Sequence, residues 1–176
     1  MKKLIAVLLS LSLALTVCAV ASAATYTADG YYAITYPDEL QLDNTTYASE
    51  SAEGYRWLFD LANDEFLIEA NVTQLDQYAD FSLSNADESD KQFYFTEVGN
   101  TFADYSPEWL DTVTAESGLV FYIFHLVDSD GPYLYAEAIE NGLSANFVCY
   151  YFNRDPDDAL LETLKSILNS IAPPEA

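Results

Sequence analysis

The chain has 176 residues, of which 51% are hydrophobic and 15% aromatic, and its 29 acidic and six basic side chains give a formal charge of −23. A chain of this length buries enough apolar surface to fold as one domain, and its composition excludes a disordered or low-complexity protein. The negative charge makes nucleic acids and anionic membrane surfaces poor partners, whereas cations and basic proteins would be attracted.

Residues 1–23 have the pattern of a secretory signal peptide. Two lysines precede an apolar run from Leu4 to Val20, and small residues lead up to Ala23, after which we expect cleavage. Serine and threonine interrupt the apolar run, so we expect no membrane span. The sequence therefore predicts a secreted, extracellular protein in which residues 24–176 form a single domain.

A lipoprotein signal is the alternative for this segment. Leu15 lies three residues before Cys18, and acylation of Cys18 would anchor the protein to a membrane. Removal of the first 23 residues would leave four basic residues against 29 acids, a formal charge of −25. It would also leave Cys149 as the only cysteine, which excludes an intramolecular disulfide.

The first half of the predicted domain contains strands. Residues 31–36 alternate in the manner of a strand, which Pro37 ends. Residues 55–61 and 66–72 are rich in aromatic and aliphatic side chains, and the short polar segment between them predicts a hairpin.

The middle of the chain has a helical pattern. Tyr94, Val98 and Phe102 recur at helical spacing and predict a helix over residues 90–102. The sequence Ser-Pro-Glu-Trp at residues 106–109 resembles a helix start, so we expect a second helix there.

The last part of the chain predicts an antiparallel meander and a closing helix. Residues 118–152 read as three strands, with turns at residues 128–131 and 141–142. Both faces of the first of these strands are apolar, so we expect it to be covered on both sides. Asp155 and Pro156 predict the start of a helix, whose apolar stripe comprises Leu160, Leu161, Leu164, Ile167, Leu168 and Ile171.

The opening strand and the order of the elements resemble the PsbP-like family. Residues 32–37, Tyr-Ala-Ile-Thr-Tyr-Pro, are similar to the aromatic-x-aliphatic-x-Tyr-Pro opening of that family. The resemblance implies an α+β fold, an α/β/α sandwich whose antiparallel sheet of about six strands is flanked by helices. It also favours binding over catalysis, although no functional residue of the photosynthetic members matches a position here.

Few residues suggest catalysis or metal binding. His125 and Cys149 are the only histidine and cysteine after residue 23, and their apolar neighbours favour packing over an activated thiolate. One histidine and one cysteine exclude the common transition-metal ligand sets. Asp128 and Asp130 precede Gly131 in a pattern typical of a tight turn, although the two carboxylates also make a calcium-stabilised module an alternative.

The aromatic residues are the other unusual feature. The strands contain more tyrosine and phenylalanine than one core holds, and we expect Trp57, Tyr133 and Tyr150 to contact a ligand. The prediction is a secreted, acidic, monomeric, non-enzymatic domain that binds a protein, an envelope component or a small ligand. A small carboxylate-dependent hydrolase of glycosidase type remains an alternative, because 29 acids single out no catalytic pair.

Overall fold

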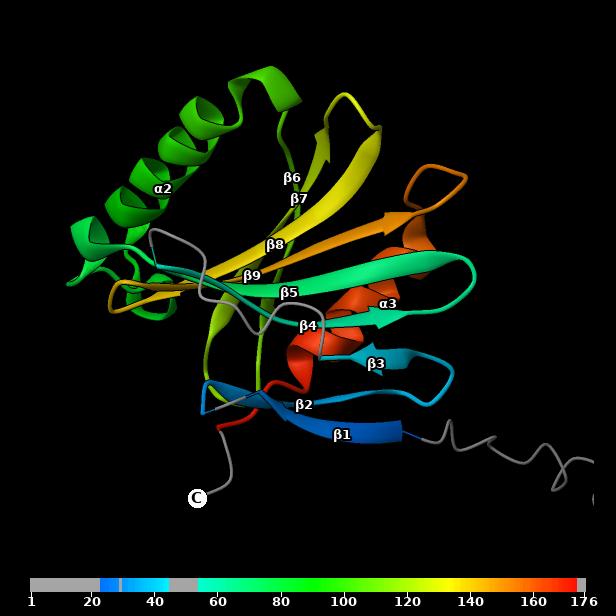
Figure 1. Ribbon diagram of the computed structural model, residues 1–176. Helices are drawn as coiled ribbons and strands as arrows, with labels where there is room; N and C mark the ends of the chain where they lie inside the picture. The colour runs from blue at the N-terminus through cyan, green and yellow to red at the C-terminus, as the bar shows by residue number, and fades with distance from the viewer. Residues whose placement is uncertain (1–22, 29, 45–53, 174–176) are drawn as a thin grey trace, which may run out of the picture.

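The computed structural model describes residues 23–28, 30–44 and 54–173. Seven strands form the main sheet, in the order β3–β4–β5–β9–β8–β7–β6, and every neighbouring pair is antiparallel (Figure 1). A separate hairpin pairs β1 with β2. The strands are β1 (Ala23–Ala28), β2 (Tyr32–Pro37), β3 (Gln41–Asp43), β4 (Tyr55–Ala62), β5 (Phe66–Gln74), β6 (Glu108–Thr114), β7 (Val120–Val127), β8 (Pro132–Glu140) and β9 (Leu143–Tyr151).

Two helices flank the sheet, α2 (Glu88–Thr101) and α3 (Asp158–Asn169), so the predicted α+β class is confirmed. Residues 1–22 of the predicted signal peptide, Cys18 among them, lie outside the described residues. Within the described part of the chain, every helix is too short or too polar to cross a membrane.

Most of the predicted elements are present. The meander corresponds to β7, β8 and β9, and its Asn141-Gly142 turn has positive φ at both residues, as a tight hairpin requires. The early hairpin corresponds to β4 and β5, and the helix expected around Tyr94 is α2, capped by the Asp87 carboxylate.

Two local predictions were wrong. The helix expected at residues 106–109 does not form, because Ser106 adopts a left-handed conformation (φ 50°) and the following residues pair with β7 as strand β6. The main sheet has seven strands because it gains β6 and β3, which were not expected, whereas the strand expected at residues 31–36 is β2 and pairs with β1 outside it. The cap of α3 is Asp157 instead of Asp155, and its Oδ1 accepts a hydrogen bond from the backbone N of Leu160 at 3.0 Å.

The two faces of the sheet form two separate cores, because side chains alternate along each strand. On one face, α3 and the β1–β2 hairpin cover aliphatic and small residues, together with Phe59, Phe121 and Phe147 at its centre. On the other face, α2 and the turn at residues 83–85 pack against Tyr122, Phe124 and Leu126. Figure 1 shows α2 and α3 on opposite sides of the sheet.

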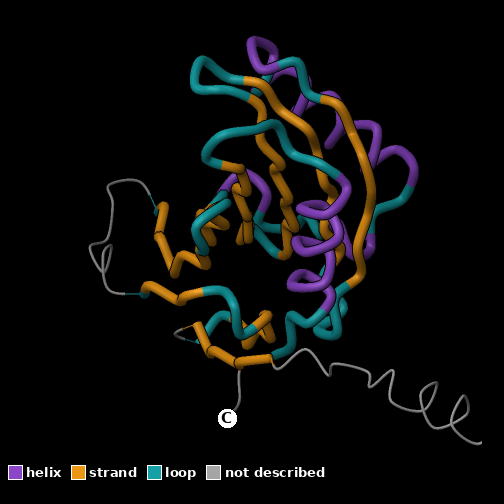
Figure 2. Tube along the Cα trace, turned by 90° about the vertical axis from the view of Figure 1, so that its right-hand side faces the viewer, coloured by secondary structure: helices purple, strands orange, loops and turns teal. Residues whose placement is uncertain are grey.

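The segment after α3 is joined to the β1–β2 hairpin. The backbone groups of Ala33 in β2 and Ala172, just after α3, exchange two hydrogen bonds of 2.9 Å. The Ile171 carbonyl also accepts a bond from Ser117 in the β6–β7 turn. Figure 2 shows the hairpin beside the segment that follows α3.

Candidate functional site

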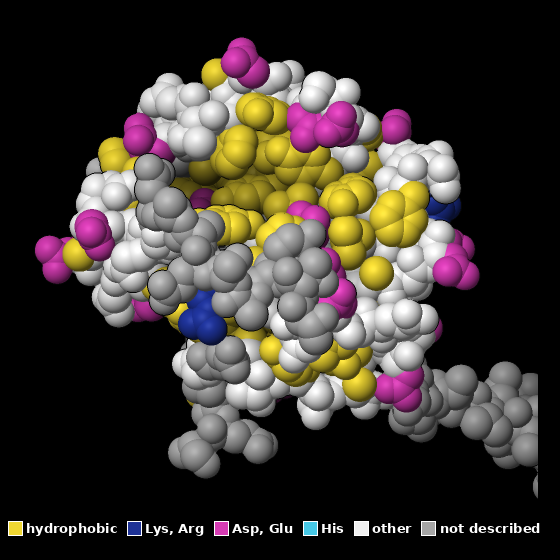
Figure 3. Space-filling view, viewed as in Figure 1, with side chains coloured by type: hydrophobic (Ala, Val, Ile, Leu, Met, Phe, Trp, Pro, Cys, Tyr) yellow, Lys and Arg dark blue, Asp and Glu magenta, His cyan; other side chains and the backbone are white. Residues whose placement is uncertain are grey.

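A hollow of about 710 Å³ opens on the α2 side of the sheet, where β8 begins and β9 ends. We call it the β8–β9 hollow. Its walls come from the β7–β8 turn, the two strands and the segment between β9 and α3, with Glu69 from β5 and Phe102 from the end of α2. Figure 3 shows hydrophobic side chains gathered in a depression on this face, with acidic side chains around it.

Aromatic rings make up most of the apolar wall of the hollow. They are Phe102, Tyr133, Tyr135, Tyr150 and Phe152, whereas Tyr151 borders the hollow but packs its ring against Phe66 in the core under α3. The Phe102 and Tyr135 rings lie 5.2 Å apart, which joins the end of α2 to the sheet. Burial, together with the nearby Asp128 carboxylate, raises the pKa of Tyr133 to about 12. The Tyr133 hydroxyl therefore stays neutral and can donate a hydrogen bond to a ligand.

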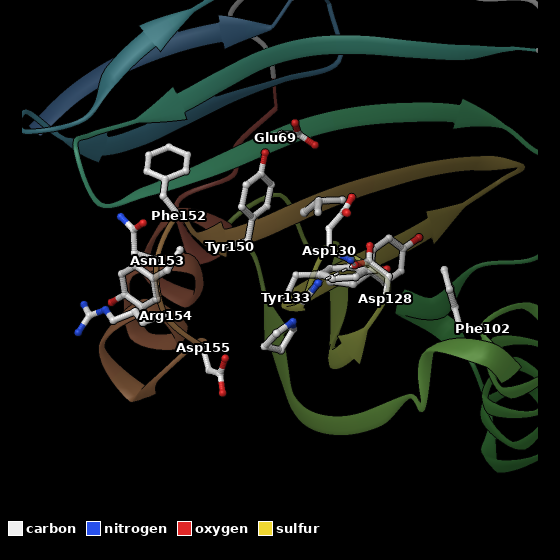
Figure 4. Close-up of a pocket in the computed structure, with 15 residues that line it drawn as sticks. Glu69, Phe102, Asp128, Asp130, Tyr133, Tyr150, Phe152, Asn153, Arg154 and Asp155 are labelled. Atoms are coloured by element: carbon white, nitrogen blue, oxygen red, sulfur yellow. Dashed lines mark hydrogen bonds between the residues drawn. The ribbon is translucent and has the colours of Figure 1, made fainter.

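Carboxylates give the hollow its charge. Glu69, Asp128, Asp130 and Asp155 line it. Glu69 lies opposite Asp60 of β4 and Val148 of β9, and Tyr150 projects towards it (Figure 4). Burial, and then the Asp60 charge, raises the pKa of Glu69 to about 7. This side chain therefore changes its charge near neutral pH. The three aspartates lie in turns and are exposed or half-buried.

Arg154 is the only basic side chain among the described residues that line the hollow. Its guanidinium lies 3.3 Å from Glu65 and 3.4 Å from Asp157, and it stacks over the Tyr151 ring at 3.8 Å from the ring centre. Its charge is thus already balanced by two carboxylates, and the hollow keeps a negative field.

Asp128 holds the β7–β8 turn at the rim. Its Oδ1 accepts hydrogen bonds from the backbone N of Asp130 at 2.8 Å and from that of Gly131 at 3.0 Å. Gly131 has a φ of 132°, which a side chain would strain. Among the described residues, no three acidic, histidine or cysteine side chains are grouped to hold a metal ion. Calcium binding by Asp128 and Asp130 stays a prediction, which melting with and without a chelator would test.

A buried carboxyl lies next to the hollow, beneath α2. Glu137 of β8 accepts hydrogen bonds from the Tyr94 hydroxyl at 2.9 Å and from the Ser144 hydroxyl at 2.6 Å. Burial raises the pKa of Glu137, while these hydroxyls act in the opposite direction. A smaller cavity of about 260 Å³ adjoins this group, and it shares Phe102 and Tyr135 with the β8–β9 hollow.

Four of the five residues expected to contact a ligand or metal line the β8–β9 hollow. These are Tyr133, Tyr150, Asp128 and Asp130. Trp57 lies elsewhere, on β4, where its Nε1 donates to Asp60 Oδ1 at 2.9 Å. Trp57 therefore does not line the β8–β9 hollow with the other four residues.

His125 and Cys149 lie on strands that are separated by β8. Leu134 of β8 pairs with both of them, so the histidine and the thiol are two strands apart. Burial raises the pKa of the Cys149 thiol well above its ordinary value. This arrangement is typical of packing and unlike that of an activated nucleophile.

Sequence reasoning missed Glu69, Phe102, Arg154 and Glu137. Two of them carried a signal, since Glu69 is the only charged residue of β5 and Glu137 lies between two alanines inside β8. Phe102 and Arg154 gave no such signal, because their place at the hollow depends on where α2 ends and where the segment after β9 turns.

No family model matches the chain, and no curated protein matches its sequence. A solved structure does match: the solution structure of cyanobacterial PsbP (CyanoP) from Synechocystis sp. PCC 6803 superposes with a TM-score of 0.50. The match covers 88% of this chain and 94% of that chain, at 16% sequence identity. At this identity the likeness concerns the fold alone, and the chain has a PsbP-like fold.

Proposed function

We propose that this protein is a secreted, non-enzymatic binding domain of the PsbP-like family, which holds a small ligand in the β8–β9 hollow. The single observation that supports this most is the hollow itself, whose lining combines five aromatic rings with four carboxylates. Its volume of about 710 Å³ is in the range of small-molecule sites in proteins.

The placement of polar groups also supports a binding role. An apolar wall with a few polar groups aimed into it is the usual composition of a ligand pocket. Here the Tyr133 hydroxyl and the Glu69 carboxyl supply a donor and an acceptor on different strands. Both belong to the sheet, so their positions are fixed by the strand register.

A titration followed by nuclear magnetic resonance tests the proposal. Isotope-labelled protein is mixed with small aromatic and aliphatic probes, and the backbone signals of residues 131–133 and 148–155 are followed. At least one probe should shift these signals, and Tyr133→Ala should weaken that binding about fivefold or more. Trp109→Ala is the matched control, because it removes an exposed aromatic ring from β6, outside the hollow. Shifts confined to other surfaces, or none with any probe, would refute the proposed site.

A carboxylate-dependent hydrolase is the second candidate. One observation favours it: Glu69 has a pKa of about 7 and lies opposite a second acid, Asp60, which is the pattern of an acid and its partner. Assays with glycoside and ester substrates distinguish the two functions. Turnover that Glu69→Gln abolishes would support the enzyme and exclude the non-enzymatic proposal.

A further inference from the structure

We propose that the ligand of the β8–β9 hollow is an organic cation, an ammonium group carried on an apolar body of small-molecule size. This inference rests on the proposed binding function and adds the chemical class of the ligand. Three observations support it: the charge of the lining, the aromatic rings of the hollow and the fact that its carboxylates come from different elements.

The charge of the lining favours a cation. Four carboxylates and one guanidinium line the hollow, and the guanidinium of Arg154 already contacts Glu65 and Asp157. The whole chain adds to this field, with a formal charge of −23. A cleft lined by one sign of charge concentrates ions of the opposite sign and repels an anionic ligand.

The aromatic rings favour the same class of ligand. Ammonium and guanidinium groups are attracted to the face of a tyrosine or phenylalanine ring. One such contact lies at the edge of the hollow, where the Arg154 guanidinium is 3.8 Å from the centre of the Tyr151 ring, a ring that packs in the core under α3. Further rings beside the carboxylates come from Tyr133, Tyr150 and Phe152. The ammonium group of such a ligand would contact the carboxylates, and its apolar body would contact the rings.

The spread of the carboxylates favours an organic cation over a metal ion that all of them would hold together. Glu69 comes from β5, Asp128 and Asp130 from the β7–β8 turn, and Asp155 from the segment after β9. They do not form a group of three that could hold a metal within the described residues. An organic cation does not need converging ligands, because one carboxylate can pair with its ammonium group while its apolar body contacts the aromatic rings.

Three probes of nearly equal shape test the ligand class. Phenethylamine is a cation, phenethyl alcohol is neutral and hydrocinnamate is an anion, and each carries the same phenyl ring. Titrations at low ionic strength and slightly alkaline pH should give the tightest binding for phenethylamine and at least about tenfold weaker binding for hydrocinnamate. The signals that shift should be those of residues 131–133 and 148–155.

Variants that each remove one negative charge test where in the hollow the cation binds. Glu69→Gln should weaken phenethylamine binding about three- to tenfold, and Asp130→Asn about twofold, because Asp130 is more exposed. Both substitutions keep the shape of the side chain. Glu116→Gln is the matched control, because it removes the same charge from the β6–β7 turn, at the opposite end of β7 from the hollow. This control should leave the binding unchanged.

The outcomes separate the ligand class from the binding function. If phenethyl alcohol or hydrocinnamate shifts the same signals as strongly as phenethylamine, the hollow binds ligands but the cation proposal is wrong. If Glu116→Gln weakens binding as much as Glu69→Gln, the attraction is that of the whole protein and the proposed site of the cation is refuted. If no probe shifts these signals, both the function and the ligand class fail.

Discussion

The two faces of the main sheet are covered by helices that carry different side chains. The face under α3 is closed by aliphatic residues of that helix, four of which are fully or almost fully buried. The face under α2 is closed by aromatic residues and includes the buried Glu137 with its hydroxyl partners. Only on the α2 face does the sheet also border the β8–β9 hollow.

Because of this difference, the two faces contribute differently to the stability of the fold and to ligand binding. Aliphatic packing contributes free energy of folding in proportion to the apolar area that it buries, and it offers no polar group to a ligand. A face with tyrosine hydroxyls and carboxyls contributes less per unit of area, because polar groups are desolvated there. We infer that the α3 face mainly stabilises the fold and that the α2 face carries the binding site.

The largest expected effect comes from the α3 face. Leu164 is fully buried there, and Leu164→Ala should lower the free energy of unfolding by about 2–5 kcal/mol, because it leaves a cavity. Denaturant unfolding measures this loss, and below the unfolding transition phenethylamine should bind as it does to the unchanged protein. A loss under about 1 kcal/mol would break the proposed division between the faces.

A smaller effect, dependent on pH, is expected under α2. Tyr94→Phe removes one hydrogen bond to Glu137 and should lower the free energy of unfolding by about 1–3 kcal/mol. Burial raises the pKa of Glu137 above the ordinary value of 4.5, so its contribution to stability is fully present below 4.5 and decreases as pH rises through the folded-state pKa. The lost hydroxyl bond stabilises the ionised form most, so the loss in Tyr94→Phe should grow with rising pH.

Melting curves over a range of pH values test this, with Tyr36→Phe as the control. Tyr36 is buried in the β1–β2 hairpin, on the α3 side, away from Glu137. Its substitution should give a loss that does not change with pH. A loss in Tyr94→Phe that is constant with pH would show that Glu137 keeps one protonation state throughout.

The smallest expected effect lies at the rim. Arg154 is exposed, so Arg154→Ala should cost less than about 1 kcal/mol of stability in spite of its two ion pairs. Phenethylamine should nevertheless bind about twice as tightly, because the rim loses its positive charge. Calorimetric titration of both proteins compares the affinities, and weaker binding by the variant would contradict a cation site.

The local patterns that predicted the fold correctly are those that are compatible with only one kind of local structure. Asn141-Gly142 predicts a tight turn because both residues tolerate positive φ, and the stripe from Leu160 to Ile171 predicts a helix because its spacing fits no strand. Ser106-Pro107 failed for the opposite reason. The same residues fit a helix start or the start of an edge strand, and pairing with β7 decided between the two.

The candidate site was predictable only in part. Tyr133, Tyr150, Asp128 and Asp130 come from one hairpin and the next strand, so the meander brings them together. Glu69 joins them because β5 pairs with β9, a contact between distant parts of the chain that no local pattern specifies. Its pKa near 7 depends on that same pairing and on Asp60 of β4.

The bridge between Ala33 and Ala172 has a practical consequence for experiments. It holds the end of the described chain against the β1–β2 hairpin, and the bond from Ser117 to Ile171 puts that end near the β6–β7 turn. The β8–β9 hollow lies at the other end of β7. A linker, an affinity tag or a sensor surface attached at the C-terminal end would therefore lie away from the hollow, and one immobilised preparation can serve every titration described above.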